Sequence, residues 1–202
     1  MATQNPGRPI ILASSSAFRK SLLERLQITF SIDSPDIDES CLAEESPEDY
    51  VSRLSLAKAQ AVAARHSNAV TGTLIIASDQ CSVLNGNIIG KPGDHRSAIK
   101  QLQASSAKKV SFLTGLCVLD AKSGKYQLDV VPFNVHFREL NLEEIDRYLI
   151  AEQPYNCAGS FMAEGLGITL FKKLEGDDPT SLIGLPLIRL CEMLREFGSK
   201  LP

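Results

Sequence analysis

Runs of apolar residues in the first third of the chain follow two different spacings. A short apolar run that ends the segment 8–13 predicts a strand, and after three serines a leucine stripe at helical spacing predicts a helix over 18–26. A second strand is predicted over 29–33. The pair Ser46-Pro47, followed by two acidic residues, is typical of a helix start, so we expect a long helix over 47–65.

Strand and turn signals alternate through the middle of the chain. The apolar stretch 74–78 predicts a short strand that delivers Asp79 at its carboxyl end, and Asn85-Gly86 between apolar segments predicts a hairpin. The other predicted elements are helices over 94–104 and 141–151, long strands over 109–120 and 126–137, a strand over 168–174, and helical segments opened by Pro179 and Pro186. This mixture predicts an α/β protein with a mixed sheet.

Length, composition and charge narrow the class of protein. The 202 residues, 44% hydrophobic and 22% charged, fit one globular domain over residues 1–202 or two small lobes. A net charge of -3 argues against a nucleic acid polymer as partner. No signal segment and no apolar run of membrane length is visible, so we expect a cytoplasmic protein outside the membrane.

Cysteine and histidine are too scattered to suggest a zinc or redox centre. The five cysteines form no C-x-x-C pair, and the three histidines lie far apart in the sequence. We therefore expect reduced structural thiols and chemistry that rests on carboxylates and cations.

The serine turn between the first strand and the first helix has the ingredients of an anion site. Ser14 lies in this turn and Arg19 in the first helical turn, where backbone N–H groups and a guanidinium can face a phosphate. The alternative is a simple serine cap with solvated cations. Lys58 shares a helix face with apolar residues, so it either snorkels to the sheet edge or reaches into a cleft to neutralise a phosphate.

Two carboxylates could hold a divalent metal. Asp79 follows an apolar strand, a position where α/β proteins bind ligands, and Glu39 ends an acidic turn. Together they could bind Mg²⁺, although a turn-forming aspartate and a solvated glutamate remain alternatives. Lys91 lies between a glycine and a proline that fix its direction. The chain has no P-loop motif, so triphosphates would be handled without one.

Seven short motifs, in order along nearly the whole chain, resemble those of the Maf family. They are Leu12-Ala13-Ser14-Ser15-Ser16-Ala17-Phe18-Arg19-Lys20, Asp38-Glu39, Leu56-Ala57-Lys58-Ala59, Ser78-Asp79-Gln80, Gly90-Lys91-Pro92, Ala158-Gly159-Ser160-Phe161 and Gly184-Leu185-Pro186-Leu187. The resemblance implies an elongated α/β fold of two lobes around a cleft, a homodimer, and hydrolysis of nucleoside triphosphates to monophosphate and pyrophosphate with Mg²⁺ or Mn²⁺.

The resemblance also implies residue roles. Asp79 matches the proton acceptor that activates water, and Glu39 helps to place the metal, with Asp79 as a second candidate ligand. The phosphate chain is expected to be bound by Ser14, Arg19, Lys58 and Lys91.

The positions that select the substrate correspond to Phe18, Gln80 and Glu164, and this set resembles the 7-methyl-GTP subgroup, whereas members that prefer dTTP and UTP have arginine, threonine and glutamine there. Methylation makes guanine cationic, so Phe18 can bind it by stacking and Glu164 can accept its hydrogen bonds. The family usually has proline where this chain has Ala17, and the subgroup has tryptophan in place of Phe18.

Other interpretations remain open from the sequence. Phe18 could pack in the core and Glu164 could be a solvated loop charge. The same reaction on pyrimidine nucleotides, or a nucleotide-binding regulator of septum formation without turnover, would also fit the family motifs. Pyrophosphate release across a nucleotide panel separates these hypotheses.

Overall fold

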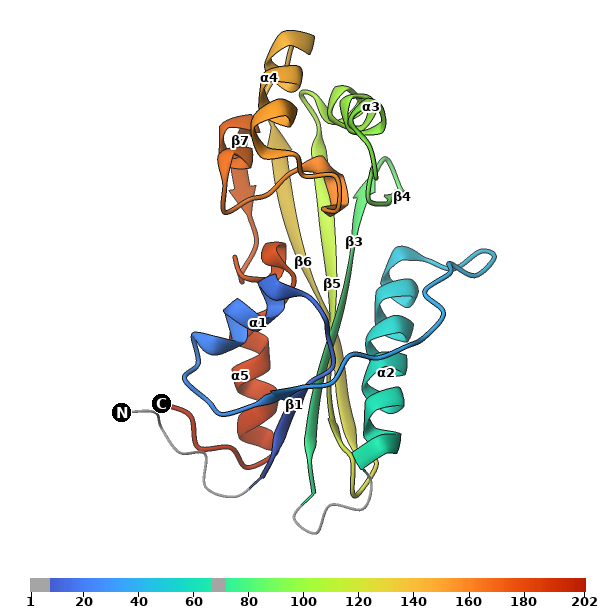
Figure 1. The fold of residues 1–202 in the computed structure, drawn as a ribbon, viewed down its shortest axis with the longest axis vertical. Helices are drawn as coiled ribbons and strands as arrows, with labels where there is room; N and C mark the ends of the chain where they lie inside the picture. Colours follow the sequence, from blue (N-terminus) through green and yellow to red (C-terminus); the bar gives the residue numbers. More distant parts are fainter. Residues whose placement is uncertain (1–7, 67–71) are drawn as a thin grey trace.

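The computed structural model describes residues 8–66 and 72–202, and within them the chain forms a seven-stranded mixed sheet (Figure 1). The strand order is β2-β1-β3-β5-β6-β7, and β4 pairs with β3. β1 lies parallel to β2 and β3, and the other pairs are antiparallel. The strands are β1 (Ile10–Leu12), β2 (Ser31–Ile32), β3 (Leu74–Leu84), β4 (Asn87–Ile89), β5 (Lys109–Asp120), β6 (Tyr126–Phe137) and β7 (Phe171–Glu175).

Helices cover the sheet at both ends of an elongated molecule (Figure 1). β3, β5 and β6 run along its length, with α1, α2 and α5 around one end and α3 and α4 around the other. The helices are α1 (Ala17–Glu24), α2 (Pro47–His66), α3 (His95–Ser105), α4 (Leu142–Glu152) and α5 (Leu187–Glu196), and three short 3-10 helices are η1 (Ala158–Ser160), η2 (Leu166–Leu170) and η3 (Ser181–Ile183). No helix in the described ranges has the length and apolar character to cross a membrane.

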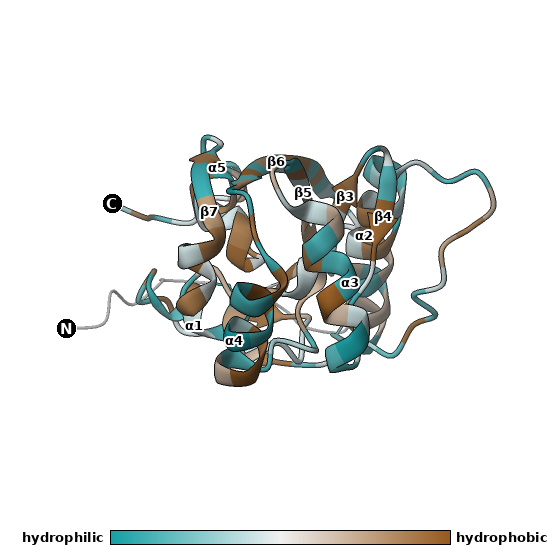
Figure 2. Cartoon of the chain, turned by 90° about the horizontal axis from the view of Figure 1, so that it is seen from above, coloured by the Kyte–Doolittle hydropathy of each residue, from teal (hydrophilic) through white to brown (hydrophobic). Residues whose placement is uncertain are grey.

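Alternate residues of the central strands pack against different helices. Odd-numbered residues such as Ile75 and Cys117 join the core under α2, whereas even-numbered residues such as Ile76 and Leu116 join the core under α1 and α5. This period of two follows from the pleat of a strand. In Figure 2, brown and teal bands alternate along β6. Adjacent residues of β3 therefore face different helices.

One edge of β3 has a gap in its pairing. β1 pairs with β3 only as far as Ile76, and β4 begins to pair at Ser82. Among the described residues, the stretch 77–81 thus has a strand neighbour on the β5 side alone. The gap opens at the carboxyl end of β1, where the chain turns into α1, and this is the kind of position at which α/β sheets bind ligands.

The structure confirms the mixed α/β sheet, the hairpin at Asn85-Gly86 and the two long strands, and it corrects two predicted elements. The predicted strand end at Asp79 is wrong, because β3 continues through it to Leu84. The predicted strand over 168–174 is also wrong in its first half, because η2 extends to Leu170 before β7 begins.

Candidate active site

The gap beside β3 opens into a cleft of about 630 Å³, here called the main cleft. A smaller cavity of about 180 Å³, here called the side cavity, adjoins it and shares part of its wall. The main cleft contains eight of the nine residues predicted for the site, namely Ser14, Phe18, Arg19, Glu39, Lys58, Asp79, Gln80 and Lys91. The ninth, Glu164, lines the side cavity. The structure therefore brings the predicted set together from distant parts of the chain.

Asp79 is held at the floor of the main cleft by two residues of α2. Its carboxylate Oδ1 accepts a hydrogen bond from Lys58 Nζ at 2.6 Å, and its backbone N–H donates to Ser55 Oγ at 2.9 Å. Asp79 is only 7% exposed, so a charged partner is needed to offset the loss of hydration. The buried charge is thus fixed in place through both its side chain and its backbone.

Lys58 bridges the two carboxylates that were predicted to bind metal. Its Nζ lies 2.7 Å from Glu39 Oε1 and 2.6 Å from Asp79 Oδ1. Burial disfavours the charged form of Glu39, but the hydrogen bond and charge of Lys58 outweigh it and lower the pKa of Glu39 below its ordinary value. Of the two predicted positions for Lys58, the sheet edge and the cleft, the structure shows the cleft. There its ammonium group neutralises the carboxylates of Glu39 and Asp79.

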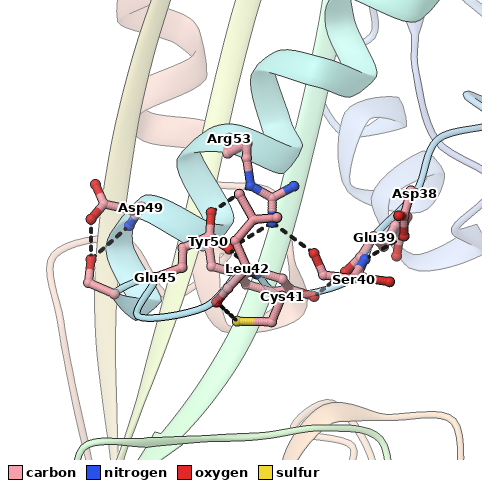
Figure 3. Close-up of polar contacts among 10 residues, drawn as sticks. Asp38, Glu39, Ser40, Cys41, Leu42, Glu45, Asp49, Tyr50 and Arg53 are labelled. Carbon is pink, nitrogen blue, oxygen red and sulfur yellow. Dashed lines mark hydrogen bonds and ion pairs between the residues drawn. The ribbon is translucent and has the colours of Figure 1, made fainter.

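The loop that carries Glu39 is tied to the start of α2 (Figure 3). Arg53 donates to both carboxylate oxygens of Glu45 and to the backbone oxygen of Ser40. Tyr50 donates its hydroxyl to the backbone oxygen of Glu39 at 3.1 Å. These contacts order an otherwise exposed segment and keep the Glu39 carboxylate within reach of Lys58.

Arg19 lies across the cleft in a setting built by the C-terminal part of the chain. Its Nε donates to the carbonyl oxygen of Gly184 at 2.8 Å, and its Nη1 donates to Ser14 Oγ at 3.4 Å. The same carbonyl accepts the hydroxyl of Ser78 at 2.9 Å. Burial lowers the pKa of Arg19 from its ordinary value, opposed by the negative charges of Asp79 and Glu39. Ser16 caps α1 through the backbone N–H of Arg19, so the capping role is also present.

The side cavity is lined by the predicted selectivity residues. Phe18 is 39% exposed and faces both cavities, so it does not pack in the core. Gln80 lines both cavities, and Glu164 lies on a loop that α4 supports through a hydrogen bond from Met162 N to the Tyr148 hydroxyl. Lys91 is exposed at the rim that the two cavities share.

The donor set fits a divalent metal that arrives with its substrate. Within the ranges 8–66 and 72–202, no group of three or more His, Cys, Asp or Glu side chains could hold an ion by itself. Glu39 and Asp79 offer carboxylate oxygens at the cleft, and Mg²⁺ is commonly bound by one or two carboxylates, waters and substrate phosphates.

Several residues that build the site were not singled out from the sequence. Ser55, Ser78 and Thr114 place or orient site residues but read as ordinary buried polar positions. Gly115 pairs with Asp79 across the sheet, and a side chain there would collide with α2. Ser78 and Gly184 lay within two of the motifs, but the hydrogen bond that joins them has no local sequence signal.

Comparisons with known proteins place the chain among known sequences. The family model described as Maf-like protein matches residues 9–197. A protein of Pseudomonas savastanoi pv. phaseolicola named 7-methyl-GTP pyrophosphatase is 54% identical over 193 residues, which are 96% of this chain and 98% of that protein. A protein of Alcanivorax borkumensis with the same name is 53% identical over 202 residues, the full length of both.

Two solved structures resemble the fold at low identity. The Staphylococcus aureus Ham1 protein has a TM-score of 0.47 at 12% identity and covers 64% of this chain and 72% of its own. A dITP/XTP pyrophosphatase of Mycobacterium abscessus has a TM-score of 0.43 at 16% identity, covering 94% and 97%. The family model and the full-length relatives carry the assignment: the chain belongs to the Maf-like protein family.

Proposed function

We propose that the protein hydrolyses 7-methyl-GTP to 7-methyl-GMP and pyrophosphate. The observation that carries the proposal is the pairing of two cavities: an acidic and cationic main cleft opens into a side cavity lined by Phe18, Gln80 and Glu164. Relatives that share more than half of their residues with this chain carry the name of the same reaction.

Asp79 would act as the general base in this reaction. Lys58 stabilises the ionised carboxylate through Oδ1, and no described group donates a hydrogen bond to Oδ2. The second oxygen is thus available to accept a proton from the water whose oxygen forms a bond to the α-phosphorus. The bond between the α-phosphorus and the α–β bridging oxygen breaks, and its electron pair leaves with pyrophosphate.

The cations around the main cleft would bind the phosphate chain. Arg19 and Ser14 lie on one wall and Lys91 on the rim, so donors approach from two sides. Fixed positive charges stabilise oxygens that gain negative charge in the transition state. That Lys58 also contacts phosphate stays a prediction, which a raised KM in Lys58→Met would support.

Glu39 and Asp79 would hold the divalent metal, Mg²⁺ or Mn²⁺, against the substrate phosphates. When bound, the metal would supply positive charge that polarises the phosphoryl group. In the structure, Lys58 balances the negative charge of the two carboxylates. Chelation with EDTA should therefore abolish turnover, and added Mg²⁺ or Mn²⁺ should restore it.

The base would lie in the side cavity. Phe18 presents a partly exposed aromatic ring, and a cationic methylated guanine gains about 1–2 kcal/mol on such a ring when both are desolvated. Glu164 would accept hydrogen bonds from the base and offset its charge.

We further propose that the protein acts in the cytoplasm as a homodimer. Light scattering of the purified protein would test the homodimer.

The deciding experiment measures pyrophosphate release from 7-methyl-GTP, GTP, UTP, dTTP and CTP with each metal. A preference for 7-methyl-GTP supports the proposal. A preference for pyrimidines would keep the reaction and refute the substrate. No release from any nucleotide, together with tight binding, would instead indicate a nucleotide-binding regulator. Asp79→Asn is the matched control, since it removes the base and keeps the shape of the side chain.

A further inference from the structure

The side-chain amide of Gln80 is locked by buried acceptors on the η3 side of β3. Its Nε2 donates to the backbone oxygen of Ser181 at 2.7 Å and of Leu182 at 3.2 Å, and to Thr114 Oγ1 at 2.9 Å. Thr114 in turn donates its hydroxyl to the Ser181 oxygen at 2.9 Å. Gln80, Thr114 and the Ser181 oxygen form a closed ring of hydrogen bonds, and the Leu182 oxygen is a further acceptor for the same amide nitrogen.

This set fixes which end of the amide faces the ligand. A backbone oxygen accepts and cannot donate, so only the NH₂ end of Gln80 can face Ser181 and Leu182. Thr114 is fully buried and lies directly opposite Gln80 in the β3–β5 register, where it cannot turn to other partners. Because the nitrogen is held on the buried side, the amide oxygen Oε1 is directed to the cavities that Gln80 lines.

The side cavity consequently presents two hydrogen-bond acceptors that lie far apart in the sequence. One is Gln80 Oε1 on β3, and the other is the carboxylate of Glu164 on the loop between η1 and η2. A nucleobase edge that carries two neighbouring N–H donors matches such a pair of acceptors. Guanine has these donors at N1 and at its exocyclic amine, whereas uracil places a carbonyl on either side of its single donor.

We infer that Thr114 is a positioning residue. The Ser181 and Leu182 oxygens set which end of the Gln80 amide faces the cavity, Thr114 holds the amide in that pose, and the resulting direction of Oε1 selects a base with adjacent N–H donors. The inference rests on the proposed function for the place of the base, but it concerns binding and does not require turnover. It also explains why a polar residue occupies a fully buried position of β5.

The test is calorimetric binding of 7-methyl-GMP and UMP to wild type, Thr114→Val and Thr114→Ser. Valine keeps the shape of threonine and removes both hydrogen bonds of its hydroxyl, whereas serine keeps the hydroxyl. Loss of one oriented hydrogen bond should weaken 7-methyl-GMP about fivefold to tenfold in Thr114→Val. UMP should change less than twofold, and Thr114→Ser should bind both ligands like wild type.

A double-mutant cycle with Gln80→Met separates positioning from general damage. If Thr114 acts through Gln80, Thr114→Val should weaken 7-methyl-GMP no further once Gln80 is methionine. The inference would be overturned if Thr114→Val weakened UMP as much as 7-methyl-GMP, which would leave the ratio of the two affinities unchanged. It would also be overturned if Thr114→Val caused its full loss of 7-methyl-GMP affinity in the Gln80→Met background. A wild type that binds both ligands equally would overturn it as well.

Kinetics of the same variants distinguish this inference from the proposed function. We expect Thr114→Val to raise the KM for 7-methyl-GTP about fivefold to tenfold and to leave kcat within twofold of wild type. A wild type that binds 7-methyl-GMP selectively but releases no pyrophosphate would refute the reaction and leave the role of Thr114 supported. If Thr114→Val does not fold, Gln80→Met alone still decides whether the preference for guanine depends on this amide.

Discussion

Replacing Gly115 by alanine should disturb both stability and activity, because α2 crosses β5 at this residue. A Cβ built on Gly115 would lie 2.5 Å from Ser55 Oγ and even closer to the carbonyl oxygen of Val51. Ordinary contact begins near 3.4 Å, so α2 would have to move by about 1 Å. Forced overpacking of this kind costs about 1–3 kcal/mol, offset in part by the lower chain entropy of alanine.

The same displacement would reach Asp79, the proposed base, and Lys58. Ser55 holds the backbone of Asp79, and Lys58 lies one turn further along α2. We expect Gly115→Ala to lower the unfolding temperature by roughly 2–10 °C for a chain of this length. A shift of about 1 Å can cost about 100-fold in rate, so kcat should fall between tenfold and 100-fold.

Scanning calorimetry and pyrophosphate release measure these two effects on one preparation. Gly90→Ala is the control for thermal stability, because a Cβ there meets nothing within 4 Å and its backbone needs no positive φ. An unfolding temperature within 1 °C of wild type, with unchanged kcat, would refute the claim that Gly115 allows the close approach of α2.

Four further outcomes follow from the site. Asp79→Asn should lower kcat at least about 100-fold while its circular dichroism spectrum stays that of wild type; an active variant would show that Asp79 is not the general base. Glu164→Gln should reduce the ratio of kcat/KM for 7-methyl-GTP over GTP, and an unchanged ratio would place recognition elsewhere. Arg53→Met should raise the metal concentration needed for half activity, because it releases the loop of Glu39; an unchanged metal requirement would contradict this. The hydrogen bonds of Arg53 lower the pKa of Glu45 to about 2. This ion pair should therefore stabilise the loop fully at a pH above the ordinary glutamate pKa, and the stabilisation should be lost as the pH falls toward 2. A midpoint near pH 4 for the Glu45 carboxyl in an NMR titration would contradict this.

Elements with strong local signals were predictable from the sequence. The helix from Pro47 begins where its serine, proline and acidic residues indicated, because capping and the helix dipole act within one turn. The strands Lys109–Asp120 and Tyr126–Phe137 match their predicted bounds, and the tight turn between the two apolar runs fixes the ends at Asp120 and Tyr126. Local chemistry decides these boundaries, so it can be read without the tertiary structure.

The course of β3 depended on tertiary contacts that the sequence does not display. Asp79-Gln80 looked like a strand end, because the apolar stretch 74–78 stops just before it. The strand nevertheless continues, since β5 pairs with it throughout and Ser55 supplies the partner that a neighbouring strand would give to the Asp79 N–H. The resemblance to a family grouped the charged residues, but residues such as Ser55, Thr114 and Gly115 act through distant pairing and have no local pattern.

The gap beside β3 would let the two faces of one strand serve two parts of the proposed reaction. Asp79 faces α2 and its lysine, whereas Gln80, one residue later, faces η3 and the side cavity. Each group is supported by a different set of neighbours, so the hydrogen bonds that fix Gln80 can change without moving Asp79 or Lys58. Substitutions on the η3 side should therefore alter the choice of base mainly through KM, and substitutions on the α2 side should alter kcat for every nucleotide. A variant such as Thr114→Val that lowered kcat equally for all substrates would show that the two faces are not independent.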